Sequence, residues 1–135
     1  MKMINKLSAI FFCTALLFTQ PAAASTSDSR YIFDELEEVD DFLSWNISGW
    51  QGLDSRSLIV DIAPGKSYLL ILDRRVNGLR SGENISISSV NSRVTSGIDR
   101  VQFLDIYSRP TRIEKIYLLP DRATRKSTSE QIRTR

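Results

Sequence analysis

Residues 58–72 read LIVDIAPGKSYLLIL, which is two apolar runs joined by a turn. Leu58 to Ala63 is rich in β-branched and apolar side chains, and Pro64-Gly65-Lys66 is a strong turn signal. Tyr68 to Leu72 is apolar at every position, which is typical of a strand buried on both faces. We therefore expect a β-hairpin here, with its second strand at the centre of a sheet.

Shorter strand patterns continue on both sides of this hairpin. Strands are expected over about 42–47, 50–53, 84–90, 93–95, 100–106 and 111–119. Several alternate apolar and polar residues, and turn residues separate them at spacings of about 8–14 residues. The sequence predicts an all-β domain over residues 42–120, as a small antiparallel roll, barrel or sandwich of about six or seven strands.

The two ends of this domain carry different patterns. Residues 25–41 are acidic, and within 31–43 the apolar residues fit either one face of a helix or the start of an edge strand. We expect a short helix or turn there, with a strand from about Phe42. Residues 121–135 contain five basic residues and only Ala123 and Ile132 as apolar groups, so a disordered basic tail is predicted.

Residues 1–24 have the three parts of a secretory signal peptide. Lys2 and Lys6 precede an apolar run from Leu7 to Phe18, and Ala22-Ala23-Ala24 supplies a small-residue cleavage site. The run is shorter than the roughly 18 residues that a membrane span requires. We expect cleavage after Ala24, export to the periplasm of a Gram-negative bacterium, and no transmembrane span in the remainder.

Export would change the chemistry of the chain. The chain has 18 basic and 16 acidic residues, so loss of Lys2 and Lys6 balances the charges. Residues 25–55 carry eight acidic residues against Arg30, whereas residues 56–135 are net basic, so the two parts either pack together or leave faces of opposite sign.

Residues 25–135 contain no His and no Cys, which excludes a Ser-His-Asp triad and a thiol nucleophile and disfavours zinc and copper.

Four residues are candidates for ligand binding: Trp50, Tyr68, Arg80 and Asp99. Trp50, like Trp45, stands near polar groups and could stack on a sugar or hold a peptide, although core packing is the favoured role. Asp99 follows Gly97 and is expected to hold backbone N–H groups in a turn.

Charged clusters give further candidates. Arg80 belongs with Arg74 and Arg75 to a basic loop that could attract anionic lipid or lipopolysaccharide, against the favoured alternative of a solvated loop. Export argues against nucleic acid as a partner. The acidic residues of 34–41 do not have the spacing of an EF-hand, so a solvated face is expected, with neither metal nor cofactor.

An ordered series of short motifs runs from Trp50 to Ile116. It comprises Trp50, Leu53-Asp54, Leu58-Ile59-Val60, Tyr68-Leu69-Leu70, Leu72, Asn77-Gly78-Leu79-Arg80, Ile85, residues 94–101, Ile113 and Ile116. The series resembles a family of bacterial exported proteins, the domain of unknown function 6491. That resemblance implies a Cys pair in relatives at the positions of Val76 and Thr111, absent here, and hence that these two residues lie close together. It implies no activity.

The residues favour a non-enzymatic binding or envelope accessory module, whose partner is an envelope protein or polymer. The alternative is an enzyme or enzyme inhibitor that acts on envelope polymers through Ser or Asp/Glu groups such as Asp54 or Asp99. A cleft that gathers several carboxylates would favour the alternative, and a filled core with scattered acids would favour the binding module.

Overall fold

The computed structural model describes residues 29–80, 84–104 and 109–135, so the predicted signal peptide lies outside the described residues. Within these ranges a short 3-10 turn precedes nine strands and one helix. Their bounds are η1 Ser29–Tyr31, β1 Glu37–Val39, β2 Asp41–Leu43, β3 Ile47–Gly52, β4 Ser57–Ile62, β5 Lys66–Leu72, β6 Ile85–Ile87, β7 Arg93–Thr95, β8 Arg100–Phe103, β9 Thr111–Leu119 and α1 Arg122–Thr134.

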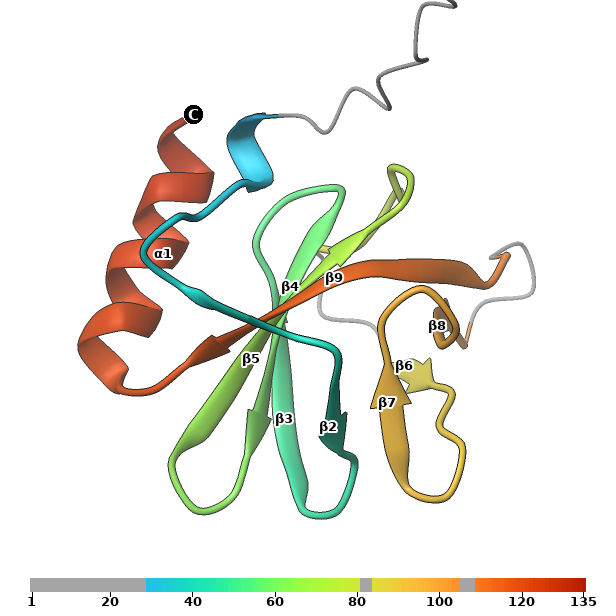
Figure 1. Cartoon of the computed structure of the whole chain (residues 1–135). Helices are drawn as coiled ribbons and strands as arrows, with labels where there is room; N and C mark the ends of the chain where they lie inside the picture. Colours follow the sequence, from blue (N-terminus) through green and yellow to red (C-terminus); the bar gives the residue numbers. More distant parts are fainter. Residues whose placement is uncertain (1–28, 81–83, 105–108) are drawn as a thin grey trace, which may run out of the picture.

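The predicted hairpin is confirmed. β4 and β5 pair antiparallel from Ser57↔Ile71 to Ile62↔Lys66, and the turn between them contains Gly65 with a φ of 84°. β9 pairs antiparallel along the other edge of β5, with a register shift between Ile71 and Leu72. β5 therefore lies inside the sheet, as its continuous apolar sequence predicts (Figure 1).

The principal sheet has seven strands in the order β3-β4-β5-β9-β8-β6, and β1 pairs with β9 beside this path. β2 and β7 form a separate two-stranded ribbon. Every pairing is antiparallel, so the predicted all-β antiparallel class is confirmed. The principal sheet alone contains the expected number of strands, and the ribbon adds two more.

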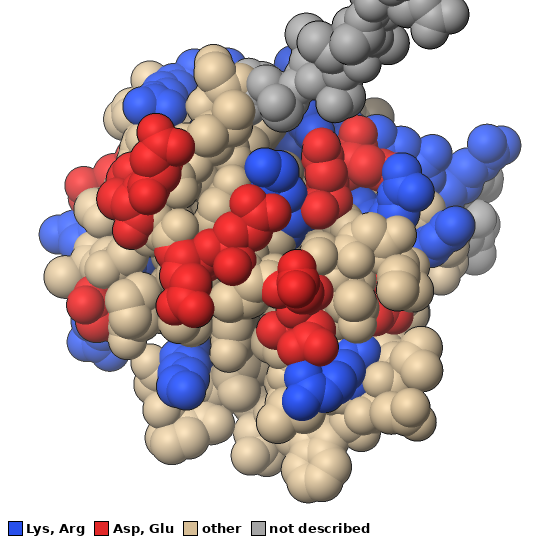
Figure 2. All heavy atoms as spheres, in the orientation of Figure 1, with Lys and Arg blue, Asp and Glu red and all other residues tan. Residues whose placement is uncertain are grey.

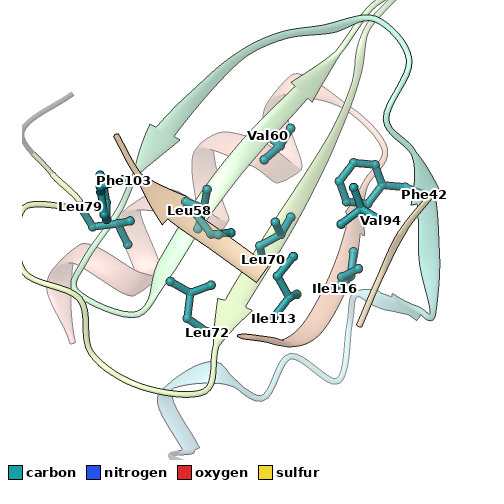
Figure 3. Close-up of a cluster of buried hydrophobic side chains, with 11 residues drawn as sticks. Phe42, Leu58, Val60, Leu70, Leu72, Leu79, Val94, Phe103, Ile113 and Ile116 are labelled. Atoms are coloured by element: carbon teal, nitrogen blue, oxygen red, sulfur yellow. The ribbon is translucent and has the colours of Figure 1, made fainter. Parts of the chain in front are cut away.

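Successive residues of β4 and β5 alternate between two hydrophobic cores. Leu58, Val60, Leu70 and Leu72 enter the first core, where the sheet meets the β2–β7 ribbon through Phe42 and Val94 (Figure 3). The intervening residues, Ile59, Leu69 and Ile71, enter the second core on the opposite face. Burial on both faces explains why these strands are apolar at nearly every position.

The second core corrects the prediction of a disordered tail. Residues 122–134 form α1, which begins at Asp121, whose carboxylate accepts the backbone N–H of Thr124 at 2.7 Å. That bond lowers the pKa of the Asp121 carboxyl below its usual value. Thr128 and Ile132, one helical turn apart, are both buried against this face of the sheet. One buried isoleucine, a capped start and the bonds from Arg125 to Asp61 hold a helix that is mostly polar.

The acidic N-terminal part is also integrated into the domain. The alternatives for 31–43 resolve into η1, β1 and β2, and the predicted boundary at residue 42 is wrong because β1 belongs to the principal sheet. Tyr31 and Phe33 pack in the second core beside α1, and the Arg30 guanidinium donates to the Arg135 carbonyl oxygen at 3.1 Å. Figure 1 shows η1 next to the end of α1.

No helix among the described residues is long and apolar enough to cross a membrane.

Candidate functional site: an arginine-lined groove

The four predicted ligand-binding residues do not converge on one site. Trp50 and Tyr68 are half-buried on β3 and β5, and each lies opposite Val60 in the strand register, so they share one face of the sheet. The Trp50 and Phe103 rings meet edge-on, with their centroids 6.3 Å apart. The Tyr68 and Phe42 rings are stacked, with their centroids 4.6 Å apart. Both rings therefore pack against the first core, and a ligand role for them stays a prediction.

Asp99 and Arg80 have different surroundings. The Asp99 carboxylate is buried and accepts two hydrogen bonds, from the Ser88 hydroxyl at 2.6 Å and from the Thr95 backbone N–H at 2.7 Å. The predicted turn role of Asp99 is therefore confirmed. Arg80 is exposed and follows the buried Leu79.

Arginines gather instead at the end of the molecule where β8 and β9 begin. A hollow of about 350 Å³ is lined by Asp73, Arg74, Arg100, Arg109, Pro110 and Arg112, and we call it the arginine groove. Figure 2 shows basic side chains on this side of the molecule and acidic ones across the middle. Among the described residues, four guanidinium groups and one carboxylate line the groove, so these residues give it a positive charge.

Strand pairing places two of these arginines side by side. Arg100 on β8 lies directly opposite Arg112 on β9, next to the pair Val101↔Thr111. Val101 and Thr111 are buried, so alternation directs Arg100 and Arg112 to the outer face of the sheet. Like charges directly opposite each other destabilise a sheet, and fold stability alone does not account for this pairing.

Two of the arginines are fixed by the protein itself. Arg112 forms an ion pair with Asp73 at 3.4 Å, and the Arg74 guanidinium donates to the Pro110 carbonyl oxygen at 2.9 Å and to the Thr111 hydroxyl at 3.3 Å. Among the described residues, no hydrogen bond or ion pair engages the guanidinium of Arg100 or Arg109. The groove thus combines two anchored and two uncommitted cationic groups.

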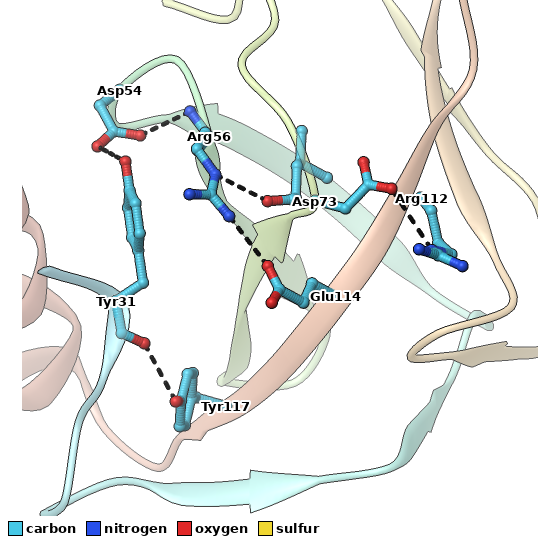
Figure 4. Close-up of polar contacts among 8 residues, drawn as sticks. Tyr31, Asp54, Arg56, Asp73, Arg112, Glu114 and Tyr117 are labelled. Atoms are coloured by element: carbon cyan, nitrogen blue, oxygen red, sulfur yellow. Dashed lines mark hydrogen bonds and ion pairs between the residues drawn. The ribbon is translucent and has the colours of Figure 1, made fainter. Parts of the chain in front are cut away.

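A polar network on the same face continues from the groove toward η1. The Arg56 guanidinium donates to the Glu114 carboxylate at 2.9 Å and to the Leu72 carbonyl oxygen at 3.0 Å (Figure 4). The same guanidinium lies over the Tyr31 ring, 5.0 Å from the ring centre. Asp54 accepts from the Tyr31 hydroxyl at 2.7 Å and from the Arg56 backbone N–H at 2.8 Å. Burial and the bond to Asp54 raise the pKa of Tyr31 to about 12. These carboxylates are occupied by structural bonds.

A second hollow lies at the β4–β5 turn beside the start of α1, with a volume of about 440 Å³. One of its three basic residues is paired within the protein, since Arg125 binds the Asp61 carboxylate through two hydrogen bonds of 3.1 Å. Asp121 also lines this hollow and caps the helix. This hollow is larger than the arginine groove but has a smaller excess of positive charge.

Metal ligation has no support in the described residues, where no three Asp, Glu, His or Cys side chains gather to hold an ion. The acidic residues near β1 are exposed except for the half-buried Asp41. Two of them form ion pairs, Asp41 with Arg93 at 2.6 Å and Glu38 with Lys115 at 3.6 Å. The segregated charges of the sequence therefore make both surface faces and contacts between them.

Sequence reasoning considered Arg74 only as part of a basic loop and missed Arg100, Arg109 and Arg112. The sequence feature that could have identified these three arginines is the predicted pair of strands on either side of the Ser108-Arg109-Pro110 turn. Had their register been known, alternation would have put Arg100 and Arg112 on one outward face.

The fold and this groove define a small antiparallel β domain with a cationic site at one end of its sheet. The chain belongs to a family of unknown function (DUF6491), whose model matches residues 2–135. This confirms the family resemblance seen in the sequence. Neither the curated proteins nor the solved structures contain a significant match.

Proposed function

We propose that this protein is an exported, non-enzymatic binding module of the periplasm, and that the arginine groove binds anionic groups of an envelope component. Export rests on the leader, in which Lys2, Lys6, the apolar run and Ala22-Ala23-Ala24 match a cleavable signal. Cell fractionation with intact-mass measurement tests this part: a periplasmic product that begins at Ser25 is expected, and a cytoplasmic product that retains Met1 would contradict it.

The observation that carries the binding proposal is the convergence of four arginines on one hollow, where the described residues supply one carboxylate, that of Asp73. Guanidinium groups present several N–H donors in a plane, which suits phosphate and carboxylate oxygens. An anion in the groove would also relieve the repulsion between Arg100 and Arg112, which the fold leaves only partly compensated by Asp73.

The geometry does not favour the enzymatic alternative. General acid–base chemistry on a polymer needs carboxylates that meet the substrate, usually in pairs. Asp54 and Asp99 lie in separate parts of the fold, and each already accepts structural hydrogen bonds. Asp61, in the larger hollow, is bound by Ser67 and Arg125.

The binding proposal is tested by calorimetric titration with inorganic pyrophosphate at low ionic strength. We expect saturable binding that weakens as salt is added, because salt screens exposed charges. Arg100→Gln and Arg109→Gln should each weaken binding by about tenfold, since a charge-assisted contact contributes roughly that factor.

Arg133→Gln is the matched control, because it removes the same charge from the exposed end of α1, away from the groove. Its affinity should remain near that of the wild type. Absence of binding by the wild-type protein, or equal losses in all three variants, would contradict a specific site.

A further inference from the structure

A third hollow, of about 420 Å³, continues from the arginine groove along the outer side of β6 and β8. It is lined by Ser86, Ser88, Ser89, Val90, Ile98, Asp99, Arg100, Gln102 and Pro110. Arg100 and Pro110 also line the arginine groove, so the two hollows adjoin each other. We call the two adjoining hollows together the channel, which has a cationic end and a second end of different character.

The second end is predominantly apolar. Val90 and Ile98 line it, and their side chains are 61% and 66% exposed. Exposed branched aliphatic side chains beside a hollow are a feature of binding surfaces, because apolar surface left in water is unfavourable. The exposed apolar groups thus lie in the hollow that shares Arg100 with the arginine groove.

The polar groups of this end are largely engaged within the protein. The Ser88 hydroxyl donates to Asp99 and accepts the Arg100 backbone N–H at 2.9 Å. Asp99 is buried with two donors on its carboxylate, so it forms part of the floor and does not offer free lone pairs at the surface. A ligand portion that lies here would mainly meet Val90, Ile98 and Pro110.

From this juxtaposition we propose that the ligand is a phosphorylated amphiphile, with its phosphate in the arginine groove and its alkyl chain on the Val90–Ile98 surface. The inference rests on the proposed function and specifies its ligand class. A phosphate group concentrates two negative charges at one point, which matches four guanidiniums around one hollow. An acidic peptide spreads single charges along a polar backbone and leaves the apolar surface poorly used.

The test compares methyl phosphate with octyl phosphate, both kept below the micelle concentration, by calorimetry on the same protein. The two share a headgroup and differ only in the chain. Octyl phosphate should bind at least tenfold more tightly, because each methylene buried on Val90 or Ile98 adds to affinity. Arg100→Gln should weaken both ligands by a similar factor.

The double variant Val90→Ser/Ile98→Ser should abolish the advantage of octyl phosphate and leave methyl phosphate binding unchanged. Leu43→Ser is the matched control, since Leu43 is also exposed, at 51%, but lies on β2 and outside the channel. It should preserve the advantage.

The outcomes separate the two proposals. Equal affinity for both phosphates, or a chain advantage that survives the double variant, would overturn the amphiphile inference and leave anion binding intact. Tighter binding of tetra-aspartate than of octyl phosphate would overturn it in favour of an acidic peptide. Failure of every anion to bind would overturn the proposed function itself.

Discussion

Asp99 stabilises a tight turn through a carboxylate that is almost completely buried. Its two carboxylate oxygens accept hydrogen bonds from the Thr95 N–H and the Ser88 hydroxyl. The Asp99 backbone N–H donates to the Thr95 carbonyl oxygen, and the Asp99 carbonyl oxygen accepts the Ile113 N–H. Removal of a buried acceptor leaves its donors without partners, which is more unfavourable than the bond itself is favourable. Asp99 is therefore a structural residue that adjoins the proposed channel.

Asp99→Ala should lower the free energy of unfolding by roughly 1–3 kcal/mol, because the half-buried Thr95 N–H and the Ser88 hydroxyl lose their acceptor. Urea denaturation followed by circular dichroism measures this change. Asp34→Ala, at an exposed position, is the control and should change stability by less than about 0.5 kcal/mol. Equal, small effects of both substitutions would contradict the structural role.

Tyr31 gives the protein a specific response to alkaline pH. Burial and the hydrogen bond to Asp54 raise its pKa from 10.0 to about 12, so the folded state holds the phenolic proton more tightly than the unfolded chain. The contribution of the Tyr31 hydroxyl to the free energy of unfolding is fully present below pH 10 and is lost as the pH rises from 10 toward 12. Burial also raises the pKa of Tyr117, which acts in the same direction.

Tyr31→Phe should reduce the dependence of stability on pH above pH 10. Phenylalanine has no proton to lose, so the contribution of Tyr31 is removed and that of Tyr117 is kept. Urea midpoints at pH 9, 10 and 11 for the wild type and the variant measure the two slopes. The same decline in both proteins would show that Tyr31 does not hold its proton in the folded state.

At the scale of elements, β3 approaches the segment after β5 through a glycine. A Cβ on Gly52 would run into the Leu79 carbonyl group, whereas a Cβ on Gly49, in the same strand, would meet nothing within 4 Å. Gly52→Ala should therefore destabilise the protein by about 2 kcal/mol or more, because backbone must move. Gly49→Ala should change stability by less than about 0.5 kcal/mol. Thermal unfolding of the pair tests the contact, and similar melting temperatures for the two variants would refute it.

Helix α1 inserts one apolar side chain into the core that it shares with the sheet. Ile132 is 2% exposed in the second core, so Ile132→Ala should lower the free energy of unfolding by about 2–4 kcal/mol. Arg133→Ala, one residue further and exposed, is the control and should have little effect. If neither substitution changes urea denaturation, the helix does not pack on the domain.

Most of the strands could be predicted from the sequence, whereas β1 and the helix could not. Residues 58–72 carry two short β-branched and apolar runs on either side of a Pro-Gly turn, a pattern that favours a hairpin from local sequence alone. Residues 122–134 have low apolar content, so their helix depends on a partner, the face formed by Ile59, Leu69 and Leu119. Local composition does not reveal that such a face is open, because tertiary packing decides the stability of amphipathic helices.

At the scale of the whole molecule, the site was harder to predict than the fold because it depends on register. Arg74, Arg100, Arg109 and Arg112 are spread over about forty residues, and no motif links them. β9 brings them together, since it pairs with β5 along one edge and with β8 along the other. A shift of one residue in the β8–β9 pairing would turn Arg100 or Arg112 toward the core.

The most direct test of the central claim, that the arginine groove is the anion-binding site, is an NMR titration of ¹⁵N-labelled protein with inorganic pyrophosphate. The arginine side-chain Nε–Hε resonances report each guanidinium separately. We expect the largest saturable shifts at Arg74, Arg100, Arg109 and Arg112. Largest shifts at Arg122 and Arg125, which line the hollow beside α1, or small linear shifts at all arginines, would contradict the claim.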